Sequence, residues 1–128
     1  MAIQDYDDDD DLDRMVFRVL IRHWGKANAV KRWELVAQIC GEEAAAVQSD
    51  ENSHDRRIRK SKERLRRQGH IICDLGDGSG CFMAATEEEY QAFRSAYGSH
   101  AFPILETIRE MDKAAQRQWP NAMQPRLL

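Results

Sequence analysis

The chain has 128 residues, 42% of them apolar, which is enough to close the core of one small domain and too little for a large multidomain enzyme. No apolar run exceeds five residues, and the first residues lack the basic and apolar regions of a signal peptide, so we expect a soluble, cytoplasmic protein with no membrane partner. The three cysteines are irregularly spaced and do not form a disulfide framework.

The net charge of −3 conceals a segregation of charge along the chain. Seven of the 22 acidic residues fall among the first thirteen positions, which leaves 19 cations against 15 acids in residues 14–128. Residues 1–11 are predicted to form a disordered acidic arm, because adjacent aspartates repel each other and offer nothing apolar to bury. Such an arm can be inert, can fold back on a basic surface of the chain, or can dock on a basic protein partner.

Apolar residues at helical spacing predict two helices in the first third of the chain. The first begins near Leu12 and ends before Gly25, and the second runs from about Lys31 to Cys40. Residues 28–30 between them are long enough only for a bend or a small strand.

Residues 41–52 are predicted to be a flexible connector, and a third helix follows it. Asn52 or Ser53 can cap that helix, which extends to Gln68 and is stopped by a glycine. Its inner face is a narrow stripe of three residues, namely Ile58, Ser61 and Leu65. The rest of the helix is basic, because residues 56–67 contain eight Arg or Lys against one acid.

A two-stranded hairpin is predicted next, from residues 71–75 and 80–84, because an Asp-Gly turn separates two apolar runs. The tip of this hairpin carries Asp77 and no cation.

Thr86 and Glu89 then form a capping box that opens a fourth helix. Pro103 begins a fifth, although one kinked helix is the alternative. Residues 118–128 lack any period and are predicted to be a flexible tail.

The order helix, short strand, helix, helix, hairpin predicts an α+β fold that is mostly helical, a winged helix-turn-helix domain over residues 12–85 with the hairpin as a two-stranded wing. Residues 86–117 form a C-terminal helical extension, whose apolar face covers the domain's own core or pairs with a second copy in a homodimer. The third helix is then the recognition helix, since a major groove admits one helix and Arg and Lys side chains bind phosphate oxygens or guanine edges. The candidate DNA-binding residues are Arg56, Arg57, Lys60 and Arg64, expected on the groove-facing side, and Arg59, Lys62, Arg66 and Arg67, expected to contact phosphates.

Several segments resemble small winged-helix proteins of bacteriophages and prophages. They are GKANAV at 25–30, WEL at 33–35, DRRIR at 55–59, LRRQGHIIC at 65–73 and GCFMA at 80–84. The resemblance covers roughly residues 12–115. It implies a DNA-binding protein of the bacterial host cytoplasm, acting as a transcription regulator or a replication accessory. Lys31 departs from the pattern, because it stands where a capping Ser or Thr is expected.

Metal binding and catalysis have less support in the sequence than DNA binding. The cysteines and histidines lack the CxxC or HxxxH spacing of zinc ligands, so we expect no metal and no cofactor. Phosphate-loop and nucleophile-elbow motifs are missing as well, so we expect no catalysis. The alternative function is a protein-protein interaction module of a phage assembly, in which the basic helix is a solvated face or binds an acidic partner.

Overall fold

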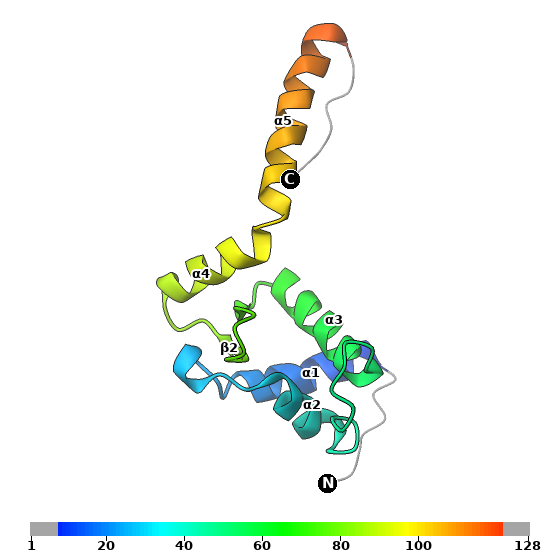
Figure 1. The fold of residues 1–128 in the computed structure, drawn as a ribbon, viewed down its shortest axis with the longest axis vertical. Helices are drawn as coiled ribbons and strands as arrows, with labels where there is room; N and C mark the ends of the chain where they lie inside the picture. Colours follow the sequence, from blue (N-terminus) through cyan, green and yellow to red (C-terminus); the bar gives the residue numbers. More distant parts are fainter. Residues whose placement is uncertain (1–7, 122–128) are drawn as a thin grey trace. The chain divides into compact units, whose positions relative to one another are not determined.

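The structure, a computed structural model, describes residues 8–121 and divides into two compact units, one reaching Phe93 and the other starting at Arg94. The described residues form a mostly helical α+β fold with five α-helices, one 3-10 turn and one antiparallel hairpin between α3 and α4 (Figure 1). The elements are α1 (Asp9–Leu20), η1 (Lys26–Asn28), α2 (Arg32–Cys40), α3 (Ser53–Arg67), β1 (Ile72–Asp74), β2 (Cys81–Met83), α4 (Glu87–Gly98) and α5 (Ala101–Gln118). Across residues 8–121, no helix has the length and apolar character that a membrane crossing requires.

Helix α1 begins three residues earlier than the sequence predicts. The Asp8 side chain caps it by accepting a hydrogen bond from the Asp10 amide at 2.9 Å. Asp9, Asp10 and Asp11 fill the first turn, where carboxylates interact favourably with the helix dipole. These three aspartates therefore belong to α1 and not to a disordered arm, while residues 1–7 lie outside the described part of the chain.

The core of the first unit lies between α1, α2 and α3, which Figure 1 shows grouped together. Each helix contributes one apolar face, and the buried stripe of α3 consists of Ile58, Ser61 and Leu65 as predicted, with Asp55 and Lys62 beside it. The large core residues of α1 and α2 are Leu12, Val16, Leu20, Leu35, Val36 and Ile39.

The predicted flexible connector, residues 41–52, is instead folded into turns. The Asn52 side-chain amide donates hydrogen bonds to the carbonyl oxygens of Ala44 at 2.7 Å and Val47 at 2.8 Å. Ala45 is buried against the core. One polar side chain therefore both holds the connector and, through its oxygen, caps the helix that follows.

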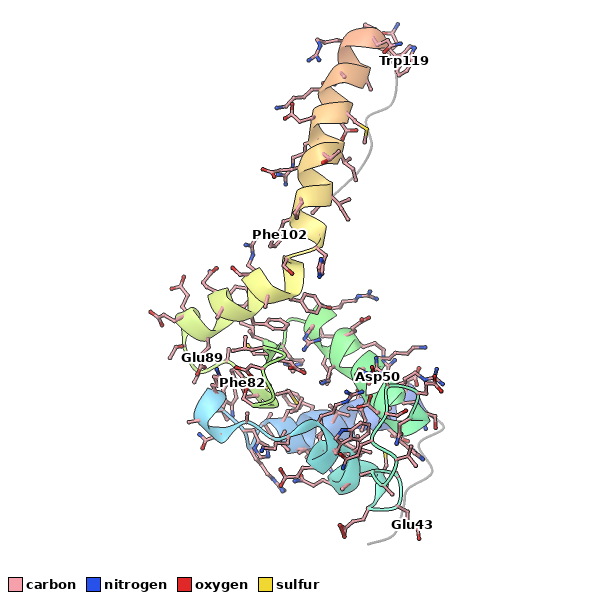
Figure 2. All side chains as sticks on the ribbon, in the orientation of Figure 1. Glu43, Asp50, Phe82, Glu89, Phe102 and Trp119 are labelled. Carbon is pink, nitrogen blue, oxygen red and sulfur yellow. The ribbon has the colours of Figure 1, made fainter. Side chains whose placement is uncertain are left out.

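The hairpin is short and is covered on both faces. In its register Cys73 pairs with Phe82, and the neighbouring pairs project to the opposite face. Ile72, Cys81 and Met83 join the three-helix core, whereas Cys73 and Phe82 pack with Phe93 of α4 (Figure 2 labels Phe82). The hairpin is thus an internal layer of the first unit.

Residue Val30 extends the hairpin as the small strand that the sequence allows. It exchanges two backbone hydrogen bonds of 2.9 Å with Cys81. Gly80 lies beside this contact, where a Cβ would be 2.1 Å from the Val30 carbonyl oxygen and where φ is +101°. Only glycine fits there without strain.

The second unit contains the last turn of α4 and all of α5, which are separate helices. Pro103 lies in the first turn of α5, where its missing N–H has no intrahelical acceptor to lose. Phe102 lies over Gly98, where a Cβ would be 2.3 Å from the ring, and the Arg94 guanidinium stacks 4.9 Å from the ring centroid. The predicted tail lies mostly outside the described residues, which end at position 121.

Candidate nucleic-acid interface

Helix α3 carries the candidate site, and local signals set its start. The Asn52 side-chain oxygen accepts hydrogen bonds from the amides of His54 at 2.9 Å and Asp55 at 3.1 Å. These bonds satisfy two of the amides that a helix leaves unpaired at its first turn. The helix begins where the sequence predicts it.

A buried carboxylate anchors the N-terminal end of α3 to α2. Asp55 is 2% exposed and accepts hydrogen bonds from Arg32 at 3.0 and 2.6 Å and from Arg59 at 2.9 Å. Both arginines also bind Asp50, Arg32 at its carboxylate and Arg59 at its carbonyl oxygen. Burial alone would raise the pKa of Asp55, but the two guanidinium groups hold that pKa below its ordinary value. Arg59, predicted to contact phosphates, is therefore engaged within the protein.

A second carboxylate ties the middle of α3 to α1. Asp13 accepts hydrogen bonds from the Ser61 hydroxyl and from Arg64, whose Nη2 and Nε lie 2.8 and 3.0 Å from its two oxygens. Burial opposes the charge of Asp13, yet these bonds lower its pKa, and the same contact raises the pKa of Arg64. Asp9 adds a weaker ion pair at 3.7 Å. Arg64, expected on the groove-facing side, is thus bound to α1.

Two further cations support the hairpin. The Lys62 side chain is only 9% exposed, and its ammonium lies 3.9 Å from an Asp74 carboxylate oxygen. Arg66 donates to the Ile72 carbonyl oxygen at 2.8 Å and stacks 4.9 Å from the ring centroid of Phe93. The sequence suggested phosphate contacts for both, but the structure gives them internal partners.

The remaining cations of α3 form an exposed surface. Arg56, Lys60 and Arg67 are exposed and stand four and then seven residues apart, so they share the side of α3 opposite its buried stripe. They extend over about 16 Å of helix. Arg57 is half-buried at the edge, and none of these four side chains forms an ion pair with an acid within residues 8–121. We call Arg56, Lys60 and Arg67 the basic stripe; Glu63 is the one acid within it.

One ion pair joins the hairpin tip to η1. Lys26 forms a 2.8 Å ion pair with Asp77, and Asp77 also accepts hydrogen bonds from the Ser79 amide and hydroxyl. The Lys26 contact and these bonds lower the pKa of Asp77 well below its ordinary value. Since residues 71–80 contain no Lys or Arg, the tip offers a nucleic acid no cation of its own.

Glu89 holds α4 to η1, and the sequence predicts only its part in the capping box. The Thr86 hydroxyl accepts a hydrogen bond from the Glu89 amide at 3.2 Å, as the capping box predicts. The carboxylate of Glu89, which Figure 2 labels, additionally accepts bonds from the amides of Lys26 at 2.9 Å and Ala85 at 2.8 Å, and these bonds lower its pKa. It thereby joins α4 to η1, a contact between residues 63 positions apart.

Sequence reasoning also missed Asp13, Asp55 and Arg32 as determinants of the site. A signal for Asp13 was present, because helical spacing places it on the same face as the buried Val16 and Leu20. An acid on an apolar face normally has a buried partner. No comparable local signal marks Arg32.

The thiols and histidines do not gather into a chemical site. The three cysteines are buried and their thiol pKa values are raised by burial, that of Cys73 to about 11. In the part of the chain that the structure describes, no group of three or more His, Cys, Asp or Glu side chains is placed to hold a metal ion. The basic stripe is therefore the feature on which a functional assignment can rest.

Comparisons of the chain with protein-family models, with curated proteins and with solved structures found no match, so the assignment depends on this geometry.

Proposed function

We propose that this chain is a non-catalytic DNA-binding protein of winged helix-turn-helix type, in which α3 lies in the major groove and the basic stripe contacts the duplex. The observation that carries the proposal is the division of cations on α3. Arg59, Lys62, Arg64 and Arg66 are engaged within the protein, whereas the basic stripe has exposed cations with no acid partner among residues 8–121. A helix that served only as a solvated face would gain by pairing opposite charges along its surface.

The internal ion pairs support this proposal because they fix the orientation of α3. Asp55 holds its first turn to Arg32 of α2, and Asp13 holds its third turn to α1. The basic stripe is therefore presented without a large loss of backbone freedom on binding, which favours affinity. A major groove is wide enough for one α-helix, and Arg and Lys bind both phosphate oxygens and guanine edges there.

The charges available set the expected strength of binding. Three exposed cations and the half-buried Arg57 would neutralise about three to four phosphates, giving a log-log salt slope of about −2.7 to −3.6. The hairpin adds little to this, because its exposed tip carries no Lys or Arg. Binding should thus be salt-sensitive and of modest affinity for one copy.

The state of the hairpin also favours a second candidate, a module that binds an acidic protein. The exposed tip of the wing carries Asp77 and no Lys or Arg, so it would add no attraction to a DNA groove. The basic stripe would then meet carboxylates in place of phosphates. The resemblance to phage winged-helix proteins, and a role in regulation or replication, stay predictions under either candidate.

Fluorescence anisotropy with a labelled mixed-sequence duplex tests the proposal. The triple variant Arg56→Ala/Lys60→Ala/Arg67→Ala should lose at least tenfold in affinity at low salt. The matched control is Arg18→Ala, which removes an exposed cation on the side of α1 away from Asp13. Equal binding by the wild type and the triple variant contradicts the proposal, and wild-type binding to a polyglutamate chain but not to DNA supports the protein-binding candidate.

A further inference from the structure

Helix α5 has an apolar face that residues 94–121 leave largely exposed. Its 18 residues include none that is buried. Ile104 is 60% exposed and Met111 is 58% exposed, while Leu105 and Ile108 are partly exposed. Single exposed apolar residues are ordinary, but a continuous row of them marks a contact surface.

The row has the spacing of a helix-helix contact. Ile104, Ile108, Met111 and Ala115 stand four, three and four residues apart, which is the alternation that keeps side chains facing one neighbouring helix. Five charged side chains lie on the other half of α5, namely Glu106, Arg109, Glu110, Lys113 and Arg117. Asp112 is the one charged residue at the border of the row. The apolar row therefore spans about 17 Å of a helix that is about 27 Å long.

We propose that α5 is a self-association surface on which α5 of a second copy of this chain packs antiparallel. Two copies of this face can pair because the row contains no charged side chain, so like charges do not meet when the face packs on itself. With the two-fold axis between Ile108 and Met111, each of these residues faces the other across the pair, and Ile104 faces Ala115. Each layer then joins side chains of different size, as close packing requires. A parallel pair would instead place Ala115 against itself and leave a gap, and it would align the two helix dipoles unfavourably.

The size of the face suits a reversible dimer. A helix pair of this length buries on the order of 1,000 Å² in total, near the lower limit of specific interfaces, so we expect a dissociation constant in roughly the micromolar range. Pairing would bury the apolar face of α5, whose 18 residues include none that is buried, and helices in proteins gain most of their stability from such packing. The proposal does not depend on DNA binding, and either can fail without the other.

Sedimentation equilibrium of the full chain tests the association. We expect twice the mass of 14.8 kDa at high concentration, and at least a tenfold weaker dimer for Ile108→Glu. Gln116→Glu is the matched control, because it adds the same charge on the opposite half of α5 and should leave the mass unchanged. A single-chain mass for the wild type up to about millimolar concentration overturns the proposal. So does a monomeric full chain that dimerises only after removal of residues 122–128, because the face would then be covered by the chain's own end.

Disulfide trapping tests the orientation independently of whether Ile108→Glu unfolds α5. After oxidation with diamide, a mixture of Ile104→Cys and Ala115→Cys chains should give cross-linked dimers, while each variant alone should give few. The three natural thiols are buried and will contribute little. Efficient cross-linking of each variant with itself would indicate a parallel pair and contradict the antiparallel arrangement.

Discussion

Asp55→Asn tests whether the buried carboxylate fixes the N-terminal end of α3. The substitution keeps the shape of the side chain but removes the charge that binds Arg32 and Arg59. Removing one partner of a buried ion pair usually costs about 3–5 kcal/mol. Here the two arginine side chains are 41% and 47% exposed and can regain water, so we expect the free energy of unfolding to fall by about 2–3 kcal/mol.

Urea unfolding followed by far-ultraviolet circular dichroism and tryptophan fluorescence measures this change. Glu63→Gln is the control, since Glu63 is an exposed acid of α3 with no ion pair within residues 8–121, and its loss should change stability by less than about 0.5 kcal/mol. An Asp55→Asn variant as stable as this control would refute the anchoring role of the carboxylate.

The pH dependence of the free energy of unfolding is a second test of the Asp55 ion pair. The folded-state pKa of Asp55 is lowered, so its contribution is complete above the unfolded pKa near 4 and is lost as the pH falls through the folded value. The stability difference between wild type and Asp55→Asn should therefore be constant near neutral pH and shrink below about pH 4. A difference that grows on acidification would contradict this assignment.

Three other outcomes follow from the packing and the charges. Gly80→Ala should lower the free energy of unfolding by more than about 3 kcal/mol, because its Cβ would meet the Val30 carbonyl oxygen at 2.1 Å, whereas Gly78→Ala has open space and should cost about 1–2 kcal/mol in urea unfolding. Changing aspartates 9–11 to asparagine should tighten duplex binding severalfold at low salt in an anisotropy titration, because the acidic first turn of α1 lies beside α3. As a control, changing glutamates 87 and 88 to glutamine should affect duplex binding less. The three buried thiols should react with a thiol reagent only as the protein unfolds, and rapid reaction of any one of them in the native protein would show that its burial is wrong.

The sequence predicts α3 well because the signals for it are local. The cap at Asn52, the stop after Gln68 and the inward stripe from Ile58 to Leu65 each depend on neighbours within a few turns. The hairpin is predicted for the same reason, since its strands are joined by a short turn rich in glycine. Local chemistry also explains the early start of α1, because the favourable interaction of Asp9, Asp10 and Asp11 with the helix dipole outweighs the repulsion among them.

The roles of the α3 cations could not be predicted in the same way. Arg64 binds Asp13 across 51 residues and Asp55 binds Arg32 across 23, and spacing along one helix gives no information on either pair. Lys62 shows what helical spacing can and cannot predict: it places Lys62 near the buried stripe but does not identify Asp74 as its partner. The burial of the hairpin under α4 likewise depends on Phe93 meeting Phe82, a tertiary contact.

The salt dependence of duplex binding tests the central claim most directly. Full-length wild type and the Arg56→Ala/Lys60→Ala/Arg67→Ala variant are titrated with the same labelled duplex across a series of salt concentrations. We predict a slope of about −2.7 to −3.6 for the wild type and a slope smaller in magnitude by about 2.7 for the variant, because three phosphate contacts are removed. Equal slopes for the two proteins would contradict the assignment of the basic stripe as the DNA-binding surface.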